Sequence, residues 1–221
     1  MPVPYVKICC ITSPEEAALA IESGAHAIGL VSRMPSGPGV IDEQRIAQIA
    51  ASIPKYIDSF LLTSETTVKG ILEQHARCRT TTVQFVDKLS TDVLETLSDA
   101  MGEIKRVQVI HVNGEEAVEE ALRVSALVDA ILLDSGKPDL AVKELGGTGR
   151  THDWSISRKI VECVECPVLL AGGLNWGNVD EAMRSVSPMG IDVCSGVRSD
   201  GKLDEAKLKQ LMHRLVSSAT A

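Results

Sequence analysis

Segments with β-strand character alternate with helical patterns eight times along this chain, and this alternation constrains the fold most strongly. Strands separated by helices of about 10–15 residues predict a parallel sheet, because each helix returns the chain to the same edge. Eight rounds without a low-complexity linker favour an α/β fold of the single-domain (β/α)8 TIM barrel type over an open doubly wound sheet. No GxGxxG fingerprint follows the first strand, which weakens the dinucleotide-binding alternative. We expect one domain over residues 1–221.

The expected elements follow from the hydrophobic period and from helix start and stop residues. Ser13 precedes Pro14 and is a good N-cap, since its hydroxyl can accept a hydrogen bond from a free amide of the first turn. The predicted strands span residues 3–10, 26–31, 56–62, 81–86, 104–112, 128–133, 167–171 and 191–195. The predicted helices, with their caps, span residues 13–23, 42–52, 64–76, 90–100, 113–126, 154–162, 175–186 and 204–217.

Composition limits the partners of such a barrel. A formal net charge of −8 argues against nucleic acid or an anionic membrane, which are bound by clustered Lys and Arg. The start of the chain has neither a basic segment nor a long apolar run, and no segment reaches the ~20 apolar residues of a membrane span. We therefore expect a cytoplasmic protein. The six cysteines are expected to be reduced. Cys163 and Cys166 form a CxxC without a second pair, which favours structural thiols and no metal.

Side chains at the carboxyl ends of the strands carry the chemistry of a TIM barrel, and the strand period of two selects them. In the first strand, Lys7 and Cys9 share one face while Ile8 and Cys10 share the other. The second pair is apolar and suits the helix layer. We therefore expect Lys7 and Cys9 to face the mouth of the barrel.

The same period brings polar groups of other strands to the mouth. Asp134 is the last residue of the sixth strand and shares a face with Ala130 and Leu132. Gln84 on the fourth strand and Asp192 on the eighth, followed by Cys194, are predicted to point inward as well.

Glycine-rich turns follow three consecutive strands. Residues 145–154 read LGGTGRTHDW, and glycines leave backbone N–H groups bare, as a phosphate requires. In this fold the loops after the last two strands often hold a substrate phosphate. The predicted phosphate-binding residues are Gly147, Thr148, Gly149, Gly172, Gly173, Ser195 and Gly196.

Five motifs, in this order, resemble those of the phosphoribosylanthranilate isomerase family of tryptophan biosynthesis: KICCIT, LLDS, GGTGRTHDW, LAGGLN and DVCSGV. The resemblance covers nearly the whole chain. It implies a (β/α)8 enzyme for the Amadori rearrangement of a phosphoribosyl aminoaldose to a 1-deoxyketose, without metal or organic cofactor. At the matching positions, Cys9 resembles the general base and Asp134 the general acid. The implied partner is a small phosphorylated sugar, and the chain is expected to act as a monomer or homodimer.

The chemistry suits both residues independently. Ring opening needs a proton donor, and the C2 proton then needs an acceptor, each typically worth ~10²–10⁴ in rate. Asp134 must be protonated part of the time, which requires a desolvated carboxyl, and Cys9 must be partly thiolate, which neighbouring Lys7 would favour. Outside this context, Cys9 would be interpreted as a small core residue and Asp134 as a helix cap or ion-pair partner.

The sequence departs from the family pattern around the aglycone. Cys10 stands where the family usually has Gly, Pro38 replaces a loop Arg, Val86 replaces a His, and Arg198 replaces a Glu. Arg33 is a candidate replacement for the missing loop Arg. Two alternatives to the isomerase follow: an isomerase of a related phosphoribosyl amine with another aglycone, and a non-catalytic barrel that binds a phosphorylated metabolite.

Overall fold

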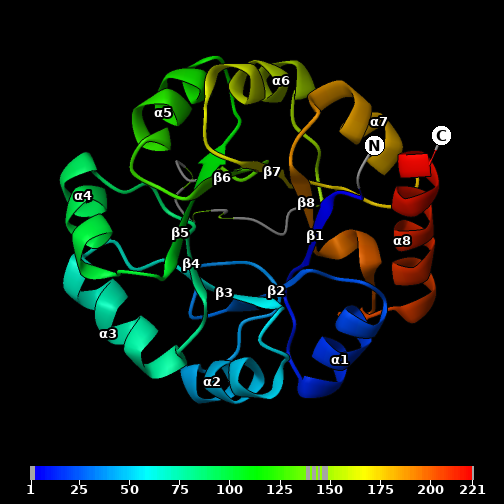
Figure 1. The fold of residues 1–221 in the computed structure, drawn as a ribbon, viewed down its shortest axis with the longest axis horizontal. Helices are drawn as coiled ribbons and strands as arrows, with labels where there is room; N and C mark the ends of the chain where they lie inside the picture. Colours follow the sequence, from blue (N-terminus) through cyan, green and yellow to red (C-terminus); the bar gives the residue numbers. More distant parts are fainter. Residues whose placement is uncertain (1–2, 138–139, 141–142, 144, 146–148, 221) are drawn as a thin grey trace.

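The computed structural model describes residues 3–137, 140, 143, 145 and 149–220. Within them, eight parallel strands close into a barrel and helices surround it as an outer ring (Figure 1). The predicted (β/α)8 fold is therefore confirmed. The strands are β1 Tyr5–Ile8, β2 Ala27–Val31, β3 Asp58–Thr63, β4 Thr82–Phe85, β5 Lys105–His111, β6 Ala130–Asp134, β7 Val168–Leu170 and β8 Gly190–Val193. The helices are α1 Pro14–Glu22, α2 Glu43–Ser52, α3 Val68–Cys78, α4 Thr91–Ala100, α5 Glu116–Ser125, α6 Trp154–Cys163, α7 Val179–Val186 and α8 Glu205–Thr220.

Closure of the barrel follows from the pairing of the first and last strands. Neighbouring strands in the sequence pair in parallel all the way round, and β1 pairs with β8 through Lys7 opposite Asp192. Alternate residues of each strand then separate into two apolar clusters. In β6, Ile131 and Leu133 belong to the cluster that includes the helices, whereas Leu132 belongs to the cluster inside the barrel. The inward side of each strand is thus set by the period of two, as predicted.

Most helix starts agree with the predicted caps, and three do not. The helix expected from Asn175 begins at Val179. The helix expected from Ser64 begins at Val68, because the Thr67 hydroxyl caps it by accepting from the Gly70 amide at 3.1 Å. The helix expected from Asn113 begins at Glu116. The Asn113 side chain instead donates to the Gly136 carbonyl at 3.1 Å and so links two loops at the barrel mouth.

The segment after β8 contains structure that the sequence did not predict. A 3-10 helix, η1 Ser195–Val197, leads into a hairpin of β9 Arg198–Ser199 and β10 Lys202–Leu203 before α8. The two residues at the hairpin tip, Asp200 and Gly201, have φ of 51° and 76°, as a type I′ turn requires. This segment brings Arg198 back over the end of β1.

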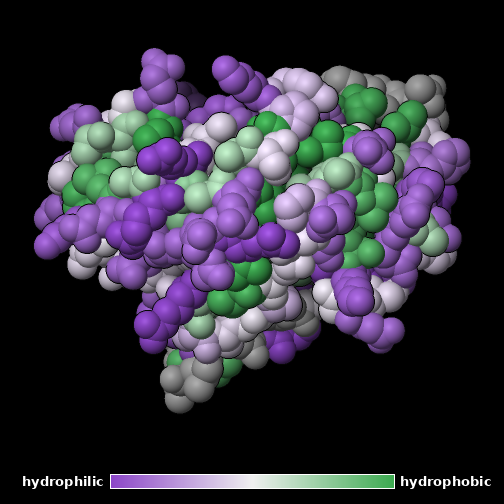
Figure 2. Space-filling model, turned by 90° about the horizontal axis from the view of Figure 1, so that it is seen from below, coloured by the Kyte–Doolittle hydropathy of each residue, from purple (hydrophilic) through white to green (hydrophobic). Residues whose placement is uncertain are grey.

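Hydrophilic residues cover much of the face shown in Figure 2, and hydrophobic residues lie between them in separate patches. Among the described residues, no helix is long and apolar enough to cross a membrane.

Candidate active site

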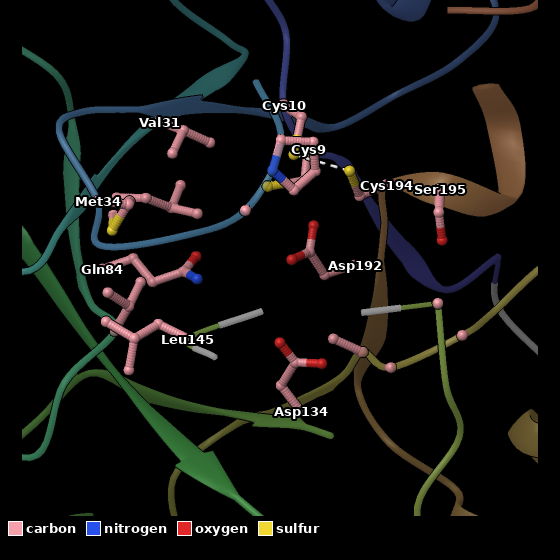
Figure 3. Close-up of a pocket in the computed structure, with 18 of the residues that line it drawn as sticks. Cys9, Cys10, Val31, Met34, Gln84, Asp134, Leu145, Asp192, Cys194 and Ser195 are labelled. Atoms are coloured by element: carbon pink, nitrogen blue, oxygen red, sulfur yellow. Dashed lines mark hydrogen bonds between the residues drawn. The ribbon is translucent and has the colours of Figure 1, made fainter. Parts of the chain in front are cut away.

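One cavity opens at the carboxyl ends of the barrel strands (Figure 3). Residues from β2, β3, β4, β6 and β8 line it together with loop residues that follow the strands, including those after β1 and β7, so segments far apart in the sequence meet there. Its lining includes both predicted acid–base residues, Cys9 and Asp134, which lie on opposite sides of the cavity in Figure 3. Its other lining residues include Cys10, Met34, Pro38, Leu62, Gln84, Val86, Leu145, Gly149, Gly172, Gly173, Asp192, Cys194 and Ser195.

Cys9 is held tightly in the position that the strand period predicted. Its amide donates to the Val193 carbonyl at 2.8 Å, which extends the β1–β8 pairing by one residue beyond the strand. Its side chain is 4% exposed. A Cβ at Gly29 on β2 would stand only 2.8 Å from Cys9 Sγ, so glycine at that position leaves room for the thiol.

Cys10 does not lie in the helix layer, and that prediction is wrong. Its backbone has φ of 63°, in the left-handed region, so the alternation of β1 ends before it. The side chain turns into the cavity, where its Sγ accepts a hydrogen bond from Cys194 Sγ at 2.7 Å. A glycine would adopt this backbone conformation without strain, so cysteine is conformationally costly here.

Asp134 ends β6 and is 8% exposed. Burial raises the pKa of its carboxyl above the ordinary value, against the lowering effects of the Ser135 amide and of His111. The Ser135 amide donates to Asp134 Oδ1 at 2.7 Å and fixes the orientation of the carboxyl group. A buried carboxyl whose pKa is raised keeps its proton at a higher pH than usual, so it is suited to proton donation.

Lys7 lies on the inward side of β1, as predicted, but is fully buried and does not line the cavity. Its Nζ forms an ion pair with Asp192 Oδ1 at 2.9 Å and lies 5.1 Å from the centre of the Phe60 ring. Burial alone would lower the pKa of Lys7, but the Asp192 carboxylate raises it above normal. Lys7 therefore stays charged beneath the cavity, and Asp192 is the member of the pair that reaches the cavity lining.

The three glycine turns meet at one side of the cavity. A Cβ at Gly149 would lie 3.5 Å from Ser195 Oγ, and one at Gly173 would lie 2.9 Å from the Gly149 carbonyl oxygen. A Cβ at Gly196 would lie 2.0 Å from the Leu174 carbonyl oxygen, so the backbone segments are in direct contact. Gly149, Gly172 and Gly173 have positive φ values of 69°, 82° and 63°. Only glycine combines these conformations with such close approach.

The other predicted substrate contacts differ in their position. Gln84 lines the cavity, is 3% exposed, and its Oε1 accepts no hydrogen bond from any described residue. Arg33 is exposed, and it is the next residue, Met34, that lines the cavity. Gly147 and Thr148 lie outside the described residues.

Arg198 is the main site-related residue whose role the sequence did not reveal. Its guanidinium forms an ion pair with Glu16 at 3.0 Å and donates to the carbonyl oxygens of Cys10 and, at 3.5 Å, of Cys9. Arg198 thus fixes the backbone that carries the candidate base. Its departure from the family pattern was the one signal of this role in the sequence. Glu16, Cys9 and Cys10 precede it by more than 180 residues, so these contacts become visible only in the fold.

No group of three or more His, Cys, Asp or Glu side chains that could hold a metal ion is found among the residues that the structure describes. The Cys10 and Cys194 thiols instead contact each other, the Asp134 carboxyl accepts from a backbone amide, and the Asp192 carboxyl pairs with Lys7.

The family model described as N-(5'phosphoribosyl)anthranilate (PRA) isomerase matches residues 6–214. A relative from Methanosarcina mazei, named N-(5'-phosphoribosyl)anthranilate isomerase 2, is 38% identical over 211 residues, covering 95% of this chain and 92% of the relative.

Solved structures extend this similarity to the fold. Phosphoribosyl anthranilate isomerase from Thermotoga maritima aligns with a TM-score of 0.83 and 28% identity, covering 97% of this chain and 99% of that one. Another phosphoribosyl anthranilate isomerase, in complex with reduced 1-(o-carboxyphenylamino)-1-deoxyribulose 5-phosphate, aligns with a TM-score of 0.80 and 26% identity, with the same coverage. The similarity extends over nearly the whole chain in both sequence and fold.

Proposed function

This chain belongs to the N-(5'-phosphoribosyl)anthranilate isomerase family, and on that basis we propose how its residues divide the work of catalysis. The chain is an aldose–ketose isomerase of the tryptophan pathway. It converts a phosphoribosyl aminoaldose to a 1-deoxyribulose phosphate by an Amadori rearrangement. The observation that best supports the residue roles is the meeting of Cys9, Asp134 and the glycine turns around one cavity.

Asp134 is the general acid and Cys9 the general base. Asp134 protonates the furanose ring oxygen, the ring opens, and a Schiff base forms at C1. Cys9 then removes the C2 proton, and the resulting enolamine tautomerises to the ketone. Two observations support this division: the raised pKa of the Asp134 carboxyl, and the position of Cys9 across the cavity from it.

The phosphate binds to the backbone amides of the three turns. Gly149, Gly173 and Ser195 are close enough for their turns to act on one ligand, and bare amides bind phosphate without a net positive charge on the protein. Gly172 and Gly196 complete this set, and Gly147 and Thr148 join it on sequence grounds alone. Every proposed site residue comes from one chain, so a monomer and a homodimer would both carry complete sites.

Gln84 and Asp192 contact the sugar. The free Oε1 of Gln84 is a buried acceptor on the cavity wall and can receive a hydrogen bond from a substrate hydroxyl or amine. Lys7 acts from below by keeping Asp192 in place.

A second candidate function, an isomerase with a different aglycone, is favoured by the apolar wall opposite the phosphate turns. Among the described residues that line the cavity there is no Lys or Arg, and the wall carries Met34, Pro38, Leu62, Val86 and Leu145.

For the anthranilate substrate, we propose that the exposed side chain of Arg33 turns inward to bind the carboxylate.

The test is a steady-state assay with phosphoribosylanthranilate, following the loss of its fluorescence. Cys9→Ser and Asp134→Asn should each lower kcat by about 10²–10⁴. Both variants should still bind reduced 1-(o-carboxyphenylamino)-1-deoxyribulose 5-phosphate in calorimetry. Cys163→Ser is the matched control, because that thiol is exposed on α6 and should not affect kcat.

Three other outcomes would change the assignment. Near wild-type turnover in Cys9→Ser would place the base elsewhere. Loss of both binding and turnover in Asp134→Asn would make that residue structural. Analogue binding by the wild-type protein without turnover would support the non-catalytic barrel.

A further inference from the structure

Two thiols that the acid–base mechanism does not use lie in contact at the cavity wall. Cys10 follows β1 and Cys194 follows β8, and their Sγ atoms lie 2.7 Å apart (Figure 3). A disulfide bond needs about 2.05 Å, so the two sulfur atoms are within roughly 0.7 Å of bonding distance. The two residues are 184 positions apart in the sequence, and the closed barrel holds them together.

The pair is electrostatically asymmetric. The hydrogen bond with Cys10 lowers the pKa of Cys194, and the charge of Arg198 lowers it further, against the effect of burial. The same hydrogen bond raises the pKa of Cys10. Cys194 is therefore the more acidic thiol of the pair and Cys10 the less acidic one, which suits Cys194 to attack an oxidant and Cys10 to resolve the product.

Access distinguishes this pair from Cys78, Cys163 and Cys166, and the contact between the two sulfur atoms distinguishes it from Cys9. Cys10 and Cys194 both line the cavity, so a small oxidant can reach them. Cys78 is fully buried, and Cys163 and Cys166 lie on α6 and just after it, outside the cavity lining.

We infer that Cys10 and Cys194 form a peroxide-oxidised dithiol whose disulfide shuts down the isomerase site. The Cys194 thiolate attacks one oxygen of hydrogen peroxide, the O–O bond breaks, and hydroxide leaves and takes a proton from solvent. The sulfenic acid on Cys194 is then attacked by Cys10 sulfur. The S–S bond forms, the S–O bond breaks, and the departing hydroxide takes the Cys10 proton. The two cysteines lose two electrons and the peroxide becomes two waters.

The disulfide would affect both halves of the site. Cys9 precedes Cys10 directly, and Ser195 follows Cys194, so drawing the two sulfurs together moves the base and the phosphate turn. Catalytic geometry tolerates little displacement, since about 1 Å of misplacement costs about 10²-fold in rate. We expect at least a tenfold loss of isomerase activity on oxidation and its recovery with dithiothreitol. This activity measurement rests on the proposed function, whereas formation of the disulfide does not.

The experiment treats the whole protein with hydrogen peroxide and maps disulfides by mass spectrometry of a non-reducing tryptic digest. Residues 8–33 and residues 185–198 are single tryptic peptides by sequence, and we expect them to be cross-linked. Cys10→Ser and Cys194→Ser should each abolish the cross-link. Cys9→Ser, which keeps both partners, should retain it.

The outcomes separate the parts of the inference. Absence of the cross-link in a folded wild-type protein, or its persistence in Cys10→Ser, would overturn the dithiol. A quantitative cross-link with unchanged turnover would overturn the switch. If the reduced protein had no activity toward phosphoribosylanthranilate, the proposed function would fail while the peptide map still decided the dithiol.

Discussion

Replacing Gly29 with alanine tests whether Cys9 works only in its present position. The new Cβ would lie 2.8 Å from Cys9 Sγ, 3.1 Å from Lys7 Nζ and 3.2 Å from Cys9 Cα. Non-bonded heavy atoms settle at about 3.5–4.0 Å, so the thiol must move by roughly 1 Å. Because about 1 Å of misplacement costs about 10²-fold, kcat should fall by about that factor while KM changes little. Overpacking should lower the free energy of unfolding by about 1–3 kcal/mol.

The fluorescence assay gives kcat and KM, and urea denaturation shows whether the variant is folded. Gly102→Ala is the matched control. This variant is also a glycine-to-alanine change, but a Cβ at Gly102 would meet no atom within 4 Å. Its loop between α4 and β5 lies at the end of the barrel opposite the cavity. Its φ of 55° makes alanine cost about 1 kcal/mol or more of stability, but kcat should not change. A folded Gly29→Ala protein with near wild-type kcat would refute the proposal that Cys9 is the positioned base.

Three further predictions concern charged groups. Burial raises the pKa of Asp134, so the wild-type kcat should fall as pH rises through that raised value. The free energy of unfolding should fall over the same pH interval, because the folded state holds the proton more tightly than the unfolded state. Asp134→Asn should remove that dependence of stability, as urea titrations at several pH values would show. Arg33→Ala should raise KM for the anthranilate substrate about tenfold or more with a smaller effect on kcat, because a charge-assisted hydrogen bond is worth about 1.5–3 kcal/mol, and an unchanged KM would exclude this contact. Lys7→Met should cost about 3–5 kcal/mol of stability by leaving the buried Asp192 carboxyl without its partner. The double variant with Asp192→Asn should recover most of this loss in urea denaturation, and no recovery would contradict the ion pair.

The period of two was sufficient to predict the barrel interior. Asp134, Gln84 and Asp192 point inward because each shares a strand face with residues of the inner cluster, and that relation depends only on local backbone geometry. Helix starts were less predictable. Ser64 and Thr67 are both good caps in sequence, and the choice between them depends on where β3 ends, which the barrel determines.

The glycine turns show a different limit. Their positions after β6, β7 and β8 could be predicted from sequence, because each is a local run of turn residues. Their contact with one another could not, since a Cβ at Gly173 meets Arg150 and Gly149 only after two distant loops have packed together. The backbone closeness that would let three turns form the proposed phosphate site is a property of the closed barrel.

Cys10 shows how one departure from a pattern can have several consequences. Its position after Cys9 favoured the helix layer, but that inference assumed that the strand continues. A φ of 63° ends the strand there, directs the side chain into the cavity, and leaves the carbonyl oxygen to accept from Arg198. Arg198 is itself held by Glu16 on α1, so the ion pair stabilises a backbone conformation that cysteine would otherwise disfavour. The two departures from the family pattern, at positions 10 and 198, are therefore physically coupled: the arginine holds the strained backbone, and the strained backbone brings the Cys10 thiol to Cys194.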